Sequence, residues 1–564
     1  MTDNYDFIIV GGGTAGLLLA TRLATALPNK SVLVLETGSA HSDTSYLCQY
    51  DKFQPAPHLD HGYLTEPQPF LNNRKIPYVR GKGLGGSSNV NFMCYVYGSK
   101  GDYNLWADLV GDESWGWENG TQRRFKEIEN YSIEVPEDRK KYVNPLPENH
   151  GQSGPLRISV GWENGITKIF EAAIKHGMPP NTDSNSGNPV GLGVMPQTTH
   201  GSYRTTSEST YSENPPSNLK LVTSAKVAKV LFEHKTAIGV QTVDGRKFIA
   251  DNEIILAAGT FDTPKILLLS GIGPGEELAP HGIDVVHELP GVGKNMMDHV
   301  LVFLAATYTS GIFALDRDTF ASNPAAVQAA REQWAKDRTG PLGVHNSCIL
   351  GGWLKLPSMY STEEYQNLDP LWKRYIALDP VPNYEIILGG PSLPPGYVPP
   401  EGTSMMSPGV VGLNLQSRGE LKLKSADAND NPSIDPKYLS HPYDRRLMVE
   451  VVREGMDFLE SKKLGATFTS YQIAPKSRSE EDINDFIKDN LSPLSHAHGT
   501  VKMGKADDPR ACIDTNFRVY GVEKLRVVDL SVCPVSPSNH PQSTAYLVAQ
   551  TAFEKIMQEY GGKA

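Results

Sequence analysis

Two histidines lie two residues apart, at His496 and His498, in the stretch LSHAHGTVKMG. Histidine titrates near neutral pH, so it can take up a proton during a reaction, and its neutral form is a common metal ligand. The pair therefore indicates a base, a metal site that could also use His540, or polar residues that only pack. A metal site is disfavoured because no carboxylate or cysteine lies at ligand spacing. The Gly499-Thr500 turn also interrupts any strand that would place both rings on one face.

A glycine-rich turn near the N-terminus indicates a second kind of chemistry. The apolar run 7–10 (FIIV) leads into Gly11-Gly12-Gly13-Thr14-Ala15-Gly16, and an apolar helical stretch and a second strand-like run ending at Glu36 follow. The glycines at positions 11, 13 and 16 allow a tight turn and close approach of a pyrophosphate to a helix N-terminus, and Glu36 can accept hydrogen bonds from ribose hydroxyls. This βαβ unit predicts dinucleotide binding, although the motif alone does not separate FAD from NAD.

The length and charge of the chain limit what kind of protein it is. A chain of 564 residues predicts two or more domains. The net charge is −11, from 53 basic and 64 acidic residues, so neither nucleic acid nor an anionic membrane is the expected partner. No secretory signal is visible at the N-terminus, and no apolar run is long enough to cross a membrane. Five cysteines without CxxC spacing indicate reduced core thiols, and we expect a cytoplasmic protein.

Several stretches carry enough periodicity to predict the elements that position these residues. Helical character is visible at 160–177 and 324–338, and strand-like alternation at 219–233 and 236–243. A C-terminal amphipathic helix is expected in STAYLVAQTAFEKIMQEY, with Pro541 near its first turn. The proline-rich stretch 369–400 contains the strand-like YEIIL, so we interpret it as an ordered part of a substrate domain rather than a linker.

Three further segments carry a resemblance to a known family. The first is GKGLGGSSNVNFMCYVYG at 81–98, and the second is GTFDTPKILLLSGIG at 259–273 with LPGVGKNMMDH after it. The third is the C-terminal series HAHGTVKMG, FRVYGVEKLRVVDLSVCP and SNHPQSTAYLVAQ. Together with the βαβ unit, these resemble the glucose–methanol–choline (GMC) family of FAD-dependent oxidoreductases, in the family's order and over most of the chain.

The resemblance implies an α/β protein, α+β overall, with a discontinuous Rossmann-like FAD-binding domain and a substrate-binding domain that has a large, mostly antiparallel sheet. It implies residues 1–45, 75–130, 218–300 and 508–564 for the first domain, and 46–74, 131–217 and 301–507 for the second. The cofactor-binding residues that it implies are Gly11, Gly13, Thr14, Ala15, Gly16, Glu36, Gly85, Gly86, Ser87, Asn91, Val227, Asp529, Pro541 and Gln542. Some family members have a histidine joined covalently to the flavin where this chain has Val90, so we expect non-covalent FAD.

The resemblance also selects between the two neighbouring histidines. In the family's His-x-x-Gly-Thr-x-x-Met pattern, His496 holds the position of the base and His498 a variable position. The partner group before the last helix maps to His540, and Asn539 is expected to cap that helix, with the N–H groups of 541–543 directed at the flavin. The implied reaction is oxidation of a primary or secondary alcohol to a carbonyl, with a hydride passing to flavin N5 and a proton to one of the two histidines.

Alternatives remain open at this point. Some proteins with this fold do lyase or cyclase chemistry and use the flavin as a scaffold. Several family oxidases have an aromatic residue where this chain has Ser495, so O2 and another electron acceptor are both possible. The alcohol is not identifiable from sequence, because selectivity resides in residues 300–410. Aromatic residues of that stretch are more typical of core than of a pocket wall: Phe313, Trp334, Trp353 and Tyr384. We expect a monomer or homodimer, without a metal ion.

Overall fold

The computed structural model describes residues 3–41, 44–390, 397 and 399–561. Its first large unit is a seven-stranded mixed sheet in the order β10-β2-β1-β13-β12-β11, with β26 also pairing with β13. The strands are β1 (Asp3–Val10), β2 (Val32–Leu35), β10 (Leu219–Val222), β11 (Val227–Glu233), β12 (Thr236–Thr242), β13 (Lys247–Leu256) and β26 (Leu525–Val527). The predicted βαβ unit is present: β1 and β2 are parallel, and α1 (Thr14–Ala26) connects them.

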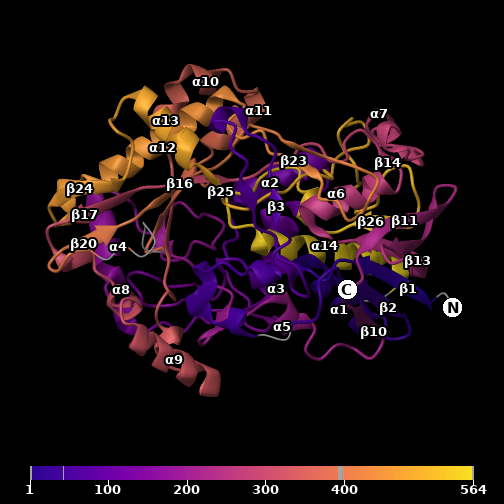
Figure 1. Ribbon diagram of the computed structural model, residues 1–564, viewed down its shortest axis with the longest axis horizontal. Helices are drawn as coiled ribbons and strands as arrows, with labels where there is room; N and C mark the ends of the chain where they lie inside the picture. The colour runs from indigo at the N-terminus through magenta and orange to yellow at the C-terminus, as the bar shows by residue number, and fades with distance from the viewer. Residues whose placement is uncertain (1–2, 42–43, 391–396, 398, 562–564) are drawn as a thin grey trace.

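The long strand β13 has two different partners along one edge. Its first part, Lys247–Ile249, pairs antiparallel with β12, and its last part, Ile254–Leu256, pairs parallel with β26. The Arg526 side chain of β26 is fully buried and donates to Glu253 of β13 at 2.6 and 2.8 Å. Strands distant in sequence therefore complete one sheet, and Figure 1 shows it at the end of the molecule where both chain termini lie.

The second unit is built from antiparallel strands. A five-stranded sheet has the order β18-β19-β21-β16-β25, and a three-stranded sheet has the order β20-β17-β24. Their strands are β16 (Val300–Phe303), β17 (Ala305–Tyr308), β18 (Leu350–Leu354), β19 (Tyr384–Leu388), β20 (Ser404–Met406), β21 (Gly409–Gly412), β24 (Phe468–Ile473) and β25 (Ser492–Pro493). These sheets lie away from the termini, and four helices are gathered beside them (Figure 1): α10 (Glu363–Gln366), α11 (Pro370–Ala377), α12 (Pro442–Leu459) and α13 (Glu480–Asn490). The predicted fold class, with a mixed Rossmann-like sheet and a second antiparallel sheet, is confirmed.

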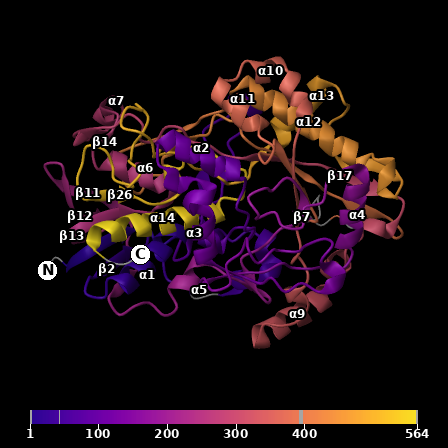
Figure 2. The same ribbon diagram turned by 180° about the vertical axis from the view of Figure 1, so that it is seen from behind.

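Helices pack on both units and share one hydrophobic core. The remaining helices are α2 (Lys100–Val110), α3 (Gln122–Ile128), α4 (Ile166–His176), α5 (Ser207–Tyr211), α6 (Gly259–Leu269), α7 (Gly275–Leu278), α8 (Asp316–Ala321), α9 (Pro324–Asp337) and α14 (Gln542–Tyr560). Figure 2 shows α14 running beside α1 and α3, against which it packs. Among the described residues, no helix is long and apolar enough to cross a membrane.

The elements expected from periodicity are present with shifted ends. The helical stretch 160–177 begins later, at Ile166 of α4, and 324–338 corresponds to α9. The run 219–233 divides into β10 and β11. In the proline-rich stretch, YEIIL is strand β19 and Pro370–Ala377 forms α11, whereas 391–396 and 398 lie outside the described residues. All five cysteines are buried and free.

Candidate active site

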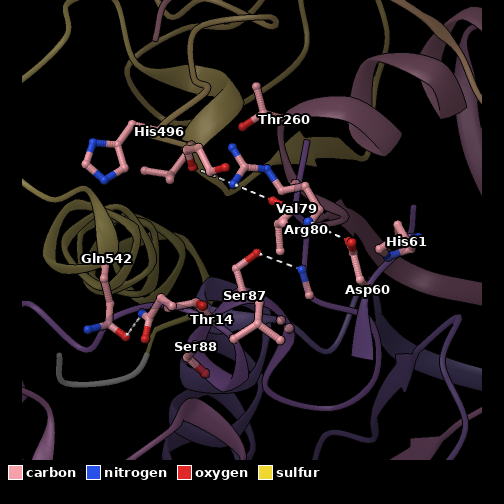
Figure 3. A pocket seen from close by; sticks show the side chains of 18 of the residues that line it. Thr14, Asp60, His61, Val79, Arg80, Ser87, Ser88, Thr260, His496 and Gln542 are labelled. Carbon is pink, nitrogen blue, oxygen red and sulfur yellow. Dashed lines mark hydrogen bonds between the residues drawn. The ribbon is translucent and has the colours of Figure 1, made fainter. Parts of the chain in front are cut away.

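One cavity of about 820 Å³ runs between the two units. Its volume lies in the upper part of the range typical of small-molecule sites. Figure 3 shows Thr14 and Ser87 of the glycine loops facing His496 and Gln542 of the C-terminal region across it. Fourteen predicted site residues line the cavity: Gly11, Gly13, Thr14, Ala15, Glu36, Gly86, Ser87, Asn91, Val227, His496, Asp529, His540, Pro541 and Gln542. Gly16 and Gly85, the other two, belong to the loops behind this wall.

The first glycine loop has two kinds of glycine. A Cβ on Gly16 would lie 2.0 Å from the Gly11 carbonyl oxygen, so a side chain there would break the turn. A Cβ on Gly13 would meet nothing nearer than 4.0 Å, because that side of the loop is open to the cavity. Helix α1 begins here without a side-chain cap and without an acidic residue in its first turn. An uncapped helix N-terminus beside an open glycine face fits a diphosphate.

The Glu36 carboxylate joins the two glycine loops. It accepts hydrogen bonds from the backbone N–H groups of Gly12 at 2.9 Å, Gly38 at 2.8 Å and Gly83 at 3.0 Å. A carboxylate has about four acceptor positions, so one remains for a ligand hydroxyl. Glu36 is therefore first a structural connection between the loops and only then a residue that could hold a ribose.

The start of α14 forms another part of the cavity wall. Asn91 donates to the Gln542 side-chain oxygen at 2.6 Å, which joins the second glycine loop to this helix (Figure 3). Among the described residues, no acceptor is bonded to the N–H groups of Gln542, Ser543 or Thr544, so they are free for a ligand that carries oxygen acceptors. The prediction that Asn539 caps the helix is wrong. Its amide instead donates to the Tyr97 carbonyl at 2.9 Å and the Thr544 hydroxyl at 2.9 Å, and Pro541 precedes the first turn.

Asp529 fixes the loop after β26 on the helix that follows β13. Its carboxylate accepts from the Gly259 N–H at 2.9 Å, the Thr263 hydroxyl at 2.5 Å and the Ser531 N–H at 2.7 Å. Burial raises the pKa of Asp529 above its ordinary value. Val227, the other predicted residue near this wall, is buried at the first position of β11.

Three imidazole rings meet at the other end of the cavity. The Nδ1 atoms of His496 and His299 lie 3.0 Å apart, and His299 Nε2 lies 2.8 Å from the Ser536 hydroxyl. The centroids of the His496 and His540 rings are 5.0 Å apart, with the ring planes at 78°. His496 and His540, predicted as a pair from positions 44 residues apart in the sequence, are thus neighbours in space.

The His299–His496 contact restricts the tautomers of both rings. One Nδ1 must donate and the other must accept, so a single proton lies between the two rings. When His496 Nδ1 donates, its Nε2 atom has a lone pair and His299 carries its proton on Nε2, toward Ser536. Burial lowers the pKa of His496 well below its ordinary value, and the neighbouring imidazoles, His540 first, lower it further. The neutral ring can therefore serve as a proton acceptor.

A buried network holds the backbone of His496 in place. Asp298 accepts from the His496 N–H at 2.8 Å, and its other oxygen accepts from the Tyr78 and Tyr438 hydroxyls, both at 2.6 Å. Burial raises the pKa of Asp298 to about 6. Arg80 donates to the Ser495 carbonyl at 2.6 Å from the other side (Figure 3). The base position therefore lies on a loop that is tied down by side chains rather than on a regular element.

His540 has a carboxylate partner that the sequence analysis missed. His540 Nε2 lies 2.9 Å from an oxygen of Glu385, which is buried in strand β19. The carboxylate accepts, so Nε2 carries a proton and the ring orientation is fixed. A single carboxylate inside the otherwise apolar strand YEIIL was the available signal for this residue, because an unpaired buried charge is costly.

His498 points away from the reaction space. It is 1% exposed, its Nδ1 is bonded to the His496 carbonyl oxygen, and its backbone pairs with Met297. Burial lowers the pKa of His498 to about 4. Within the described ranges, no group of three or more His, Cys, Asp or Glu side chains is arranged to hold a metal ion. His498 supports the loop and does not share a ligand position with His496.

Apolar side chains form the chamber next to the histidines. The wall there consists of Phe53, Phe92, Cys94, Met195, Leu301, Phe303, Ile349, Ile387 and Leu494. The four aromatic residues considered from the sequence, Phe313, Trp334, Trp353 and Tyr384, are buried in the core and do not line the described cavity. The chamber fits an apolar ligand whose polar group reaches His496 and His540.

Comparisons with known proteins identify the family of this chain. Family models described as GMC oxidoreductase match residues 5–301 and 416–549. The chain is 34% identical to a glucose methanol choline oxidoreductase of Aspergillus terreus, over 99% of this chain and 93% of that protein. It is 31% identical to an oxygen-dependent choline dehydrogenase of Stenotrophomonas maltophilia, over 98% of this chain and 95% of that protein.

Solved structures give the same answer for the whole chain. An FAD-dependent oxidoreductase from Chaetomium thermophilum superposes with a TM-score of 0.87 at 26% identity, over 99% of this chain and 100% of that one. A fungal aryl-alcohol oxidase superposes with a TM-score of 0.86 at 25% identity, over 100% of both chains. The two family models together span more than half of the sequence. The chain belongs to the GMC oxidoreductase family.

Proposed function

We propose that this protein oxidises a primary or secondary alcohol to a carbonyl, with FAD as cofactor and His496 as base. Bound FAD supplies the oxidant that takes two electrons from the carbinol carbon. The diphosphate would lie at the glycine face of Gly13 and the N-terminus of α1, and the ring near Asn91 and the start of α14. The observation that carries the proposal is the position of His496, which lines this cavity and whose Nδ1 atom lies 3.0 Å from that of the buried His299.

His496 would take the hydroxyl proton on Nε2. Its neutral form is favoured because burial lowers its pKa, and the Asp298 contact to its backbone fixes its position. Such a positioned base typically contributes a factor of about 10² to 10⁴ to a rate. His540 would hold the substrate oxygen, with its ring fixed by Glu385 at 2.9 Å, so that the carbinol C–H points at the cofactor.

We also propose that FAD is held without a covalent bond. Val90 lines the cavity and has no nucleophilic atom, and its position is where some relatives have a flavin-linked histidine. Denaturing the purified protein and filtering it tests this: all of the flavin absorbance is expected in the filtrate. Flavin that stays with the precipitated chain would contradict the proposal.

The electron acceptor is proposed to be O2 or a small-molecule oxidant. Relatives at about 30% identity are named oxygen-dependent choline dehydrogenases, and a structural neighbour is an aryl-alcohol oxidase. The apolar chamber beside the histidines favours an aromatic or aliphatic alcohol over a sugar. We propose a monomer or homodimer that works in the cytoplasm.

Anaerobic mixing with a panel of alcohols tests the function directly. A substrate should bleach the flavin absorbance in a single turnover, and admission of oxygen should then restore the absorbance if O2 is the acceptor. The alternative chemistry, a lyase or cyclase reaction, would give product while the flavin spectrum stays oxidised. That outcome would overturn the proposed oxidation.

A further inference from the structure

Lys52 is a buried cation in the wall of the same cavity. It is 2% exposed, and its Nζ donates to the Gln197 side-chain oxygen at 2.6 Å. An ammonium group has three N–H donors, and within the described part of the chain Gln197 is the one acceptor bonded to it. No described carboxylate forms an ion pair with Lys52, although a buried charge normally requires such a partner.

The surroundings of Lys52 are electrostatically positive. Burial lowers the pKa of Lys52 to about 7, with the Cys94 thiol acting in the opposite direction and the nearby guanidinium groups of Arg204 and Arg317 lowering it further. Arg204 is itself buried and donates to uncharged oxygens, among them the Asn91 carbonyl at 2.6 Å. Arg317 pairs with Glu163 at 3.4 Å. Of these three cations, Arg317 alone has a carboxylate partner among the described residues, so positive charge is in excess at this end of the chamber.

A buried carboxylate, Glu385, lies behind His540 at the histidine end of the chamber. Cys94 separates the two ends: its backbone pairs with Gln197, the Lys52 partner, and its thiol pKa, raised chiefly by burial, responds to Lys52 in one direction and to Glu385 in the other. Glu385 is bonded to His540. A ligand in the chamber therefore meets His496 and the Glu385-bonded His540 at one end and Lys52 at the other. The Arg80 guanidinium, a cation whose charge also acts on His496, donates to the Ser495 carbonyl.

We propose that Lys52 binds a carboxylate of the substrate, so that the preferred substrate is an apolar, ring-containing alcohol with a carboxylate at the end opposite the carbinol. The claim that the substrate is an alcohol rests on the proposed function, whereas the claim that it carries a carboxylate rests on Lys52. The opposite orientation would place the carboxylate beside Glu385, where like charges repel. Beside the apolar side chains of Phe53, Met195 and Ile349, a charge-assisted hydrogen bond is stronger than in bulk water.

The test uses the FAD-loaded enzyme with 3- and 4-(hydroxymethyl)benzoate, their methyl esters and benzyl alcohol. For the wild type we expect kcat/KM for at least one acid to exceed that for its ester by about tenfold or more, as a hydrogen bond between charged groups predicts. Lys52→Met should lower the value for the acid by about 10- to 100-fold and leave the ester and benzyl alcohol within about threefold. Equal loss on acid and ester would overturn the proposal.

Lys355→Met is the matched control. Lys355 is another lysine whose pKa is lowered by burial, to about 8, but it is only partly buried and its Nζ donates to three carbonyls outside the cavity, those of Ile376, Leu378 and Val381. This variant should keep the preference of the wild type for the acid. If it loses that preference to the same extent as Lys52→Met, net charge rather than Lys52 is responsible and the proposal fails.

Binding of benzoate separates this inference from the proposed oxidation. Benzoate has no alcohol, so the perturbation of the flavin spectrum on titration, or the heat of binding, reports the carboxylate site alone. We expect saturable binding to the wild type and at least tenfold weaker binding to Lys52→Met. If the enzyme oxidises none of the alcohols but binds benzoate through Lys52, the proposed function fails and the anion site stands. If Lys52→Met loses FAD, the affinities of the wild-type enzyme for benzoate and for methyl benzoate are compared instead. Equal affinities would overturn the proposal.

Discussion

His496 and His299 face each other through their Nδ1 atoms at 3.0 Å, and His299 continues to the Ser536 hydroxyl at 2.8 Å. In the tautomer in which His496 Nδ1 donates, the contact keeps a proton on the side of His496 that faces His299 and leaves its Nε2 atom as the acceptor. The tautomer of His496 therefore depends on the buried His299 ring. The pKa of His299 is itself lowered well below the ordinary value, chiefly by burial.

Replacing the two neighbouring histidines separately distinguishes the base from the supporting residue. We expect His496→Ala to slow flavin reduction by about 10² to 10⁴ with FAD still bound. His498→Asn should slow it by less than about tenfold, because His498 contacts the loop backbone and not the cavity. Anaerobic stopped-flow absorbance measures both rates. The assignment is wrong if the two variants are equally slow or if His496→Ala is nearly normal.

The pH dependence of flavin reduction should follow from the lowered pKa of His496. A base whose pKa lies below the ordinary histidine value of about 6.5 remains deprotonated as the pH falls through 6.5. With benzyl alcohol, which has no carboxylate for Lys52 to bind, we therefore expect kcat/KM to be constant from pH 8 to about 6.5 and to decline only at lower pH. A decline that begins above pH 7 would contradict a neutral, buried base.

Glu385 is predicted to act through His540. Glu385→Gln keeps the shape of the side chain but replaces the carboxylate that accepts from His540 Nε2, and we expect a 10- to 100-fold lower rate of flavin reduction. His540→Asn should cause a similar loss. The double variant is the deciding measurement, because residues that act as a unit give losses that do not multiply. Fully multiplicative losses would mean that Glu385 acts independently.

Two glycines of the first loop should respond differently to a side chain. Gly13→Val should fold with an unchanged circular dichroism spectrum but purify without FAD, because its side chain would point into the cavity. Gly16→Val should be insoluble, since a Cβ there would lie 2.0 Å from the Gly11 oxygen. Flavin content per chain and soluble yield measure the difference. Full FAD content in Gly13→Val would contradict the proposal that the diphosphate binds at this loop.

A buried ion cluster away from the cavity predicts a pH-dependent stability. His150 lies 3.2 Å from Glu129 and 3.1 Å from Asp183. Burial alone would lower its pKa, but hydrogen bonds to Asp183 and Glu129 outweigh burial and raise it to about 9. Because the folded pKa lies above the unfolded value of about 6.5, the stabilisation is fully present below pH 6.5 and is lost as the pH rises through 9.

His150→Gln should therefore lower the melting temperature by several degrees at pH 6 and by much less at pH 9.5, measured by thermal unfolding of the FAD-loaded protein. His200→Gln is the control, because His200 is exposed at the end of strand β8 (Thr199–His200). If the effect of His150→Gln is the same at both pH values, the cluster does not owe its stability to a protonated imidazole.

Local patterns in the sequence predicted the parts of the site that a short segment specifies. The spacing of Gly11, Gly13 and Gly16 requires a particular backbone, and it placed the first loop and α1. The resemblance to the family's His-x-x-Gly-Thr-x-x-Met pattern distinguished His496 from His498, and of these two rings His496 lines the cavity. Such features depend on residues within one turn or one strand.

Partners brought together by the tertiary fold were not predictable in this way. Glu385 lies 155 residues from His540, and His299 lies 197 residues from His496. Lys52 and its acceptor Gln197 are 145 residues apart. Their pairing depends on how β19 and the loops around the cavity pack together. Local patterns in a single sequence do not predict that packing. The Asn539 cap failed for a similar reason, because Tyr97 binds its amide from another segment.

The two partners of β13 have a consequence for biosynthesis. Its last three residues stay without a neighbour on one side until β26 emerges from the ribosome, and the Arg526–Glu253 contact that fastens this edge joins residues 273 positions apart. Pairing over such a separation forms late and slowly. His496, Asp529 and His540 leave the ribosome in the same final stretch. A nascent chain therefore cannot close the cofactor cavity before synthesis is almost complete, and chains that terminate before Leu525 should be recognised as unfinished by proteases rather than persist as partly loaded enzyme.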